Sequence, residues 1–253
     1  MSLRVLVIDV GGTNIKILAS GQTEPRRLPS GPAMTAAAMV EGVKQLAEGW
    51  DYDVVAIGYP GVVENDQPVT EPANLAPGWV HFDYAGAFDR PVKIVNDAAM
   101  QALGGYHKDK MLFLGLGTGL GSTLIVHGTL VPMELAHLPY RKGTFEDYVG
   151  ERALERDGKR KWRKSVFDVV ARLKAALVPD DVVIGGGNVR HLSELPPGCR
   201  AGDNANAFVG GYRLWATHPV AKRPDVRKPA AKPKPAKKAA PRKSAPPKAA
   251  AAA

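Results

Sequence analysis

Residues 3–14 read LRVLVIDVGGTN, an apolar run rich in β-branched residues that ends at an aspartate and a Gly-Gly-Thr turn. The run has the length of a buried strand, and residues 15–19 predict a second strand that returns from the turn. Residues 111–121 read MLFLGLGTGLG and repeat this order of strand and Gly/Thr turn, with 122–126 as the returning strand. Two halves that open alike predict a structural repeat, with two similar lobes and a cleft between them.

The rest of the first 217 residues has the pattern of a mixed α/β protein. Apolar spacing predicts a helix over 35–48 with Thr35 as its N-cap. The other elements expected are strands over 54–58, 92–95, 130–131 and 182–184, and helices over 97–104, 145–156, 162–177 and 204–215. We expect an N-terminal lobe of residues 1–105 and a C-terminal lobe of residues 106–217. The sequence leaves open whether the last helix packs back on the first lobe.

The net charge of +9 is unevenly placed along the chain. Residues 218–253 carry eleven Lys or Arg and one acidic residue, whereas the first 217 residues carry 23 basic and 24 acidic ones. The 218–253 segment is rich in Ala, Pro and Lys and has no large aliphatic residue after Val226, so it buries too little surface to offset the entropy of ordering. We predict a disordered basic tail, which is either a solubilising appendage or a tether for a polyanion such as RNA, DNA or polyphosphate.

Length and composition exclude several classes of protein. A chain of 253 residues, 45% of them apolar, is long enough to bury a core. No apolar run reaches the ~18–20 residues that span a bilayer, and no signal-peptide pattern precedes the first strand. The single cysteine, Cys199, excludes an internal disulfide and a multi-cysteine zinc site. These features predict a soluble cytoplasmic protein with no membrane partner and no zinc.

The first Gly/Thr turn is a candidate anion site. At Gly11 and Gly12 the missing side chains let backbone N–H groups approach a phosphate, and Thr13 adds a hydroxyl donor. Asp9, at the strand end, suits Mg²⁺, either directly or through water. The alternative is an ordinary glycine-rich hairpin with a solvated aspartate.

The second turn, at Gly117, Thr118 and Gly119, matches neither the Walker pattern nor the Gly-x-Gly-x-x-Gly fingerprint, where Leu120 takes the place of the last glycine. Two such turns at matched places predict a clamp for a polyphosphate chain. Gly186 and Gly187, after the strand 182–184, offer a third close backbone approach that suits a nucleotide. A plain strand-to-helix turn is the alternative there.

Three further positions carry candidate acid–base or binding groups. Asp97 follows the strand 92–95, where a carboxylate can accept a proton from an attacking hydroxyl, and Asn96 can bond neighbouring hydroxyls. An ordinary helix N-cap at Asn96-Asp97 is the alternative. Glu134 and His137 are close enough to converge on a small polar ligand, unless the histidine is structural. Glu146 is a further candidate acid or a solvated glutamate at a helix start.

Taken in order along the chain, these motifs resemble the ROK sugar-kinase family, and most nearly its polyphosphate glucokinase branch. The resemblance covers about residues 3–215. Its motifs are Asp9-Val-Gly-Gly-Thr13, Gly58-Tyr-Pro-Gly61, Asn74-Leu75 with Trp79, Asn96-Asp97-Ala98, Gly117-Thr-Gly-Leu-Gly121, Glu134-Leu-Ala-His137 and Gly185-Gly-Gly187. The resemblance implies an actin/hexokinase-like ATPase superfold of two RNase H-like lobes, with the sugar and the phosphoryl donor meeting in the cleft and Mg²⁺ required.

The resemblance also implies roles for individual residues. Asp97 would be the catalytic base on the sugar 6-hydroxyl, and the ring hydroxyls would be held by Gly61, Asn96, Glu134, His137 and, less directly matched, Glu146. The phosphates or nucleotide would face Asp9, Gly11, Gly12, Thr13, Gly117, Thr118, Gly119, Gly186 and Gly187. Phosphoryl transfer suits this set because it needs alignment and charge neutralisation more than covalent work. A homodimer is expected from the resemblance alone.

The chain departs from the family pattern at two points. Ala136 adds a methyl group where the family's Glu-x-Gly-His has glycine. The family's cysteine-rich zinc loop is missing, as it is in polyphosphate glucokinases. The leading hypothesis is a hexose kinase, acting on glucose with polyphosphate, ATP or both. The alternatives are a non-catalytic sugar-binding protein tethered to a polyanion by the basic tail, and an ATPase of the same superfold that acts on a non-sugar.

Overall fold

A computed structural model describes residues 3–203 and 205–216. The segment predicted to be a disordered tail lies outside these residues. The first half of the described chain contains β1 (Val5–Val10), β2 (Asn14–Ala19), β3 (Arg26–Pro29), α1 (Ala36–Leu46), β4 (Val54–Tyr59), β5 (Val63–Glu64), β6 (Gln67–Pro68), α2 (Tyr84–Phe88), β7 (Val92–Asn96) and α3 (Asp97–Gly105). The second half contains β8 (Lys110–Leu116), β9 (Leu120–Val126), β10 (Thr129–Met133), the 3₁₀ helix η1 (Leu135–His137), β11 (Pro139–Tyr140), β12 (Gly143–Thr144), α4 (Glu146–Val149), α5 (Glu151–Leu177), β13 (Asp181–Gly185), the 3₁₀ helix η2 (Gly187–His191), β14 (Arg200–Ala201) and α6 (Asn206–Trp215).

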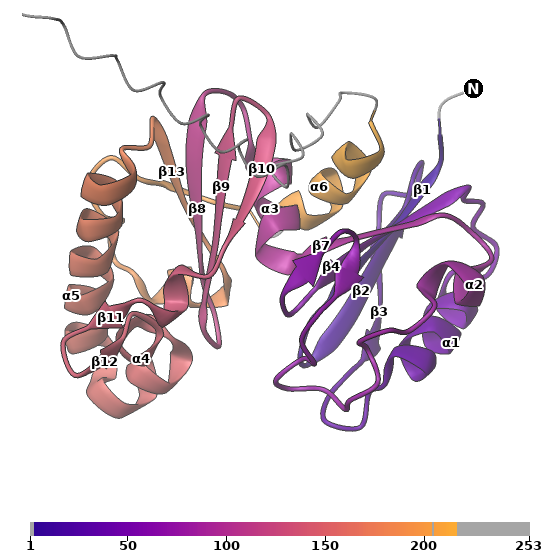
Figure 1. The fold of residues 1–253 in the computed structure, drawn as a ribbon, viewed down its shortest axis with the longest axis horizontal. Coiled ribbons are helices and arrows are strands. Elements are labelled where there is room, and N and C mark those ends of the chain that lie inside the picture. The colour runs from indigo at the N-terminus through magenta and orange to yellow at the C-terminus, as the bar shows by residue number, and fades with distance from the viewer. Residues whose placement is uncertain (1–2, 204, 217–253) are drawn as a thin grey trace, which may run out of the picture. The chain divides into compact units, whose positions relative to one another are not determined.

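Two five-stranded sheets with the same topology form the framework (Figure 1). The first has the order β3-β2-β1-β4-β7 and the second β10-β9-β8-β13-β14. In each sheet, the first three strands of this order pair antiparallel with their neighbours. The last two strands pair parallel with theirs. The predicted repeat of two similar lobes is therefore confirmed. Its cause is in the sequence, since β1 and β8 are the two apolar runs that end at Gly/Thr turns.

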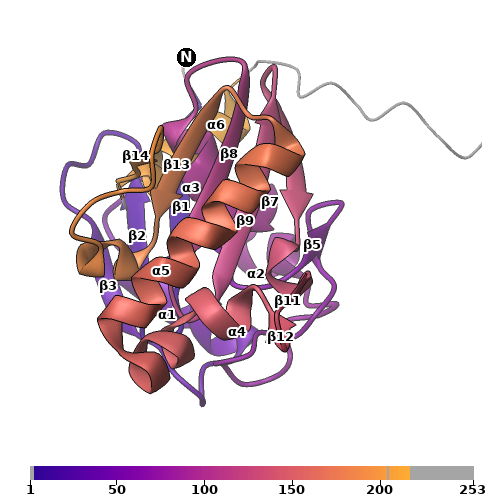
Figure 2. The ribbon, with the colours of Figure 1, turned by 90° about the vertical axis from the view of Figure 1, so that its left-hand side faces the viewer.

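Each lobe has its own core on the outer face of its sheet. In the first lobe, α1 packs Met39, Val40 and Val43 against the strands, and the Thr35 hydroxyl caps its start by accepting from the Ala38 N–H at 3.2 Å. In the second lobe, α5 lies lengthwise over the face of the sheet (Figure 2) and buries Trp162 completely. Apolar burial of this kind supplies most of the driving force for folding.

Helices α3 and α6 lie between the two sheets (Figure 1). Met100 of α3 packs with α6 on β1 and β4, while Ala98 and Ala102 pack on the second sheet. The two helices cross closely because Gly104 and Gly210 carry no side chain. A Cβ atom at either position would overlap the backbone of the other helix. Helix α3 thus contacts both lobes through different residues.

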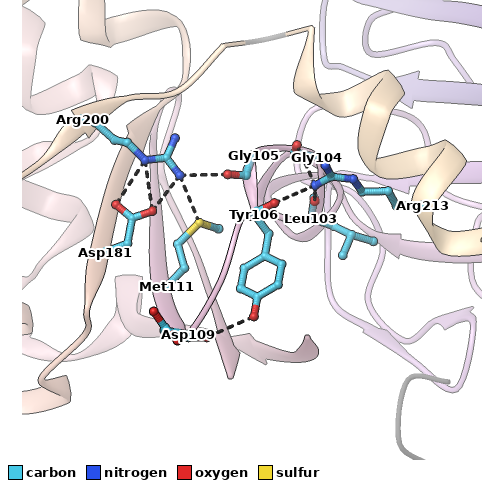
Figure 3. Close-up of polar contacts among 9 residues, drawn as sticks. All are labelled: Leu103, Gly104, Gly105, Tyr106, Asp109, Met111, Asp181, Arg200 and Arg213. Atoms are coloured by element: carbon cyan, nitrogen blue, oxygen red, sulfur yellow. Dashed lines mark hydrogen bonds and ion pairs between the residues drawn. The ribbon is translucent and has the colours of Figure 1, made fainter. Parts of the chain in front are cut away.

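Two arginines bind the C-terminal end of α3 (Figure 3). Arg213 of α6 donates to three backbone carbonyls there, at 2.7–3.0 Å, those of Leu103, Gly104 and Tyr106. Arg200 of β14 donates to the Gly105 carbonyl at 2.8 Å while it pairs with Asp181 of β13 at 2.7 Å. These bonds satisfy carbonyls that a helix end leaves without partners.

The prediction of separate helices over 145–156 and 162–177 is confirmed in part. The chain forms a short α4 that stops at Gly150, and α5 then runs to Leu177 as two helical segments that meet at Gly158. Gly150 has extended backbone and is the N-cap of α5. Gly158 has a φ of 74°, which glycine adopts without strain, and this non-helical residue separates the two segments between the predicted ranges, whereas the stop at Gly150 was not predicted. The sequence pattern also gave no signal for β3, α2 or the two-stranded β5–β6 and β11–β12 ribbons.

Candidate functional site

Asp9 is the next-to-last residue of β1, and it is paired with Gly58 of β4 and Lys16 of β2. Its side chain is 16% exposed, and its nearest cation, Lys16, keeps its ammonium group 3.9 Å away. Burial raises the pKa of Asp9, and the charge of Lys16 opposes this only in part. The Asp9 carboxylate is therefore poorly neutralised by the protein itself.

The turn after β1 is held by its carbonyl groups. The Gly11 N–H donates to the Asn14 carbonyl at 3.1 Å, and Ser30 binds the carbonyls of both Thr13, at 2.9 Å, and Gly11, at 2.5 Å. The backbone N–H groups of Gly12 and Thr13 have no partner among the described residues, and both residues are exposed. The turn can therefore offer two N–H donors to an anion.

Asp97 lies where α3 begins, between the two sheets. A Cβ atom at Gly58 of β4 would lie 3.5 Å from the Asp97 Cα atom, and one at Gly121 of β9 would lie 2.8 Å from the Ala98 Cβ atom. Glycine at both positions lets the start of α3 approach both sheets. Because Gly58 pairs with Asp9 and Gly121 follows the second Gly/Thr turn, the structure brings Asp97 next to the strands that carry both turns.

The Asp97 carboxyl group has an unusual titration. Burial raises its pKa to about 7, and the negative charges of Asp9 and Glu134 add to the rise. The Ala98 N–H opposes them by donating to Oδ1 at 2.7 Å. A carboxyl group that titrates near neutral pH has the property that a general base needs at that pH.

Asn96 is the N-cap of α3 and also fixes the neighbouring loop. Its Oδ1 atom accepts from the Ala98 and Ala99 N–H groups at 3.0 and 3.2 Å. Its Nδ2 atom donates to the carbonyl of Gly61 at 3.1 Å, which places Gly61 beside the start of α3. The N-cap alternative is thus realised, and it is compatible with a position at the site.

The second Gly/Thr turn is packed against α4, α5 and η2. The Gly117 N–H donates to the Gly119 carbonyl at 3.1 Å, while the carbonyl of Gly117 accepts from Asn188 Nδ2 at 2.9 Å. The Thr118 carbonyl accepts from the N–H of Glu151, at the start of α5, at 3.1 Å. As in the first turn, the carbonyls are occupied and Thr118 is exposed.

Glu146 binds this turn directly, because its Oε2 atom accepts from the Leu120 N–H at 3.2 Å. A side chain at Gly119 would overlap this carboxylate. The structure therefore gives Glu146 a hydrogen bond to the second turn rather than leaving it as a solvated residue at the start of α4.

The third glycine turn follows β13. Gly186 has a φ of 87°, and a Cβ atom there would overlap the backbone of Leu116. Gly187 is exposed with open space around it and begins η2. The predicted nucleotide loop is thus packed directly against the second Gly/Thr turn.

Glu134 is the N-cap of η1, which follows β10, and His137 is the last residue of η1. His137 Nε2 lies 3.9 Å from Glu134 Oε2, and both side chains are more than half exposed. Burial raises the pKa of Glu134, opposed by His137 and reinforced by Glu146. The charges of Asp9 and Glu134 act on Asp97 and the charge of Glu146 acts on Glu134, so these four carboxyl groups lie in one region. Ala136, which replaces the family's glycine, is 3% exposed and packs in the core of the second lobe, so its methyl group faces away from solvent.

Magnesium fits this donor set. Two partly buried carboxylates, Asp9 and Asp97, repel each other, and the ammonium group of Lys16 lies 3.9 Å from Asp9. Within residues 3–203 and 205–216, no three His, Cys, Asp or Glu side chains form a closed metal cage. One or two carboxylates with retained waters and substrate phosphates are the usual protein ligation of Mg²⁺.

Sequence reasoning missed polar residues that shape the site. They are Ser30 at the first turn, Asn188 at the second, and Ser122, whose hydroxyl bridges the Met133 carbonyl and the N–H of Leu135 at the start of η1. Ser122 carried a signal, as a polar residue in an apolar strand. The others act through contacts between distant segments. In the part of the chain that the structure describes, no helix is both long and apolar enough to cross a bilayer.

Comparison with known proteins places these features in a family. The ROK family profile matches residues 5–132. The polyphosphate glucokinase of Mycobacterium tuberculosis is 31% identical over 215 residues, covering 75% of this chain and 80% of the relative. The structure of the inorganic polyphosphate/ATP-glucomannokinase from Arthrobacter sp. superposes with a TM-score of 0.72 at 25% identity, covering 84% of this chain and 98% of that one.

The structure of the ROK hexokinase from Thermus thermophilus superposes with a TM-score of 0.65 at 23% identity over 83% of this chain and 97% of that one. These superpositions confirm the predicted two-lobed, actin-like ATPase fold. The chain therefore belongs to the ROK family and resembles its sugar kinases.

Proposed function

We propose that the protein is a glucokinase that transfers a phosphoryl group from polyphosphate, ATP or both to the 6-hydroxyl of glucose. The observation that carries the proposal is the position of Asp97, whose pKa is about 7, between the strands of the two Gly/Thr turns. The names of the relatives support the substrate and the donors, since they are a polyphosphate glucokinase and a polyphosphate/ATP-glucomannokinase.

In this mechanism Asp97 orients the attacking hydroxyl and takes its proton at the carboxylate oxygen that does not bind the Ala98 N–H. General base help of this kind contributes about 10²–10⁴ in rate. Glu134, His137 and the Asn96–Gly61 pair hold the ring hydroxyls, and Glu146 contributes while it is bound to the second turn.

The donor phosphates are held by the N–H groups of Gly12 and Thr13 and by the second Gly/Thr turn, with Gly186 and Gly187 at the distal end. Asp9 would hold Mg²⁺, directly or through water. When bound, the ion supplies positive charge that neutralises the phosphate oxygens. Asp9 is suited to this role because the protein leaves its charge poorly compensated.

The proposal is tested by a matrix of donors and sugars on the full chain. Glucose, mannose and a non-phosphorylatable 6-deoxyglucose are combined with ATP, tripolyphosphate and long-chain polyphosphate, each with Mg²⁺. We expect sugar 6-phosphate from glucose with at least one donor and none from 6-deoxyglucose. Sugar binding without turnover would instead indicate the non-catalytic binder, and donor hydrolysis equal with and without sugar would indicate an ATPase.

The proposal extends to the assembly and to the basic tail. A cytoplasmic homodimer is part of it, and light scattering measures the oligomer. The tail 218–253 would concentrate long polyphosphate near the site. Its deletion should then raise the KM for long chains and reduce the salt dependence of that KM, while short donors are unaffected.

A further inference from the structure

A run of positive charge lies in α5 outside the site described above. Five of the six residues 159–164 are Lys or Arg, and the sixth, Trp162, is fully buried. No carboxylate among the described residues lies within ion-pair distance of any of the five, whereas Arg141, Arg156 and Arg172 each have one. Cations gathered within six residues of a helix, most of them exposed and none with an acidic partner among the described residues, favour an anionic ligand.

The fold gathers part of this run around η2. Arg163 donates to the His191 carbonyl at 2.6 Å, and Arg190 of η2 donates to the His191 ring at 3.3 Å. Local burial lowers the pKa of His191, and the charges of Lys159, Arg190 and Arg163 lower it further. Three cations therefore surround one ring. We call Lys159, Arg160, Arg163, Lys164 and Arg190 the α5–η2 basic cluster.

The cluster adjoins the second Gly/Thr turn. η2 begins at Gly187, directly after Gly186, which packs on Leu116, and Asn188 binds the Gly117 carbonyl. At about 2 Å per residue, the five residues of η2 span roughly 8 Å. A linear anion leaving the turn would reach the cluster within a few phosphate units.

The local helix electrostatics also favour an anion. The kink at Gly158 makes Lys159 the first residue of a new helical segment. A helix N-terminus carries partial positive charge, so cations in its first turn are unfavourable unless an anion neutralises them. A nucleoside triphosphate ends in a neutral base, whereas polyphosphate carries negative charge along its whole length.

We propose that the α5–η2 basic cluster binds the distal phosphates of a long polyphosphate donor whose reacting end lies at the second Gly/Thr turn. The inference rests on the proposed function, since it assumes a phosphoryl donor at that turn. Arg160 and Arg190 can each bind a phosphate through two N–H groups, and Lys159 and Lys164 act as point charges. The cluster selects for donor length and takes no part in the transfer itself.

The test removes three exposed cations of the cluster from the full chain in K159A/R160A/R190A. Arg163 is left in place because it donates to the backbone of η2. The matched control, K44A/K108A/K161A, removes the same charge from exposed lysines, of which Lys161 lies in the same run but outside the cluster. We measure KM and kcat with ATP, tripolyphosphate and long-chain polyphosphate, and the Kd of fluorescently labelled long-chain polyphosphate without sugar.

The cluster variant should raise both the KM and the Kd for long-chain polyphosphate about tenfold at low salt. Its kcat and its KM for ATP and tripolyphosphate should stay within twofold of the native values, and the control should behave as the native chain. Equal weakening in both variants, or none in the cluster variant, overturns the inference. The Kd reports on the cluster even if the native chain phosphorylates no sugar, so the failure of the proposed function is seen separately.

Discussion

At the scale of single residues, Asp97 carries the proposed chemistry. Asp97→Asn keeps the side-chain shape and the N-terminal position in α3 but cannot accept the hydroxyl proton. We expect kcat to fall by about 10²–10⁴ or more, with the Kd for glucose within about tenfold of the native value. Single-turnover kinetics and calorimetric sugar binding measure the two effects. Asp51→Asn, on an exposed carboxylate, serves as the control, and native-like turnover of Asp97→Asn would remove Asp97 from the mechanism.

The raised pKa of Asp97 also predicts a pH dependence of stability. The native pKa is about 7, whereas the ordinary value is 3.8, so between these values the folded protein holds a proton that the unfolded chain has lost. Stability contributed by this group therefore declines as pH rises from about 4 to 7. Urea unfolding at several pH values should show Asp97→Asn gaining stability relative to the native chain over this range, by a few kcal/mol at most. A difference that does not change with pH would contradict the buried, proton-binding carboxyl group.

The raised pKa of Asp97 also predicts how activity depends on pH. Because the base must be ionised, kcat/KM should drop as pH falls from 8 to 6, with a midpoint near 7 in the free enzyme. A midpoint near 4 would mean that the Asp97 carboxyl group is not buried in the working enzyme.

At the scale of elements, the turns between strands and helices decide where the site forms. Gly186→Ala introduces a methyl group into the backbone of Leu116 at a positive φ, whereas Gly128→Ala has a similar φ of 81° with open space around it. We expect Gly128→Ala to cost about 1 kcal/mol and Gly186→Ala to cost about 1–3 kcal/mol more. Urea unfolding measures both, and equal losses would show that the contact with Leu116 relaxes freely.

At the scale of the whole described chain, α3 links the lobes and Arg213 holds its C-terminal end (Figure 3). Arg213→Ala leaves three carbonyls without this donor, and we expect a loss of about 1–2 kcal/mol in the free energy of unfolding. Arg27→Ala removes an exposed arginine of β3 whose side chain makes no hydrogen bond among the described residues, and it should change stability by less than about 0.5 kcal/mol. Equal stability of the two variants would mean that water replaces the Arg213 bonds at no cost.

The sequence by itself determined the two-lobed α/β fold, because the apolar runs at 5–10 and 110–116 and their Gly/Thr turns are local signals that repeat. It also singled out Asp97, since the pattern of Asn-Asp after an apolar strand can be recognised from the sequence alone. The break at Gly158 lies between the two predicted helices, but the break at Gly150 escaped prediction, because a glycine inside a helical pattern can continue the helix or end it and only packing selects between these outcomes.

Tertiary structure alone decided the rest. Spacing along the chain could not show that Gly58 and Gly121 admit α3 between the sheets, that Asn188 binds the second turn, or that Arg163 and Arg190 meet at His191. Each depends on contacts between segments far apart in sequence, and the pKa of Asp97 depends on the burial that those contacts create. The sequence thus identified which residue types form the site. The packing of the two lobes around α3 decided that these residues lie close together and which of them carry a proton.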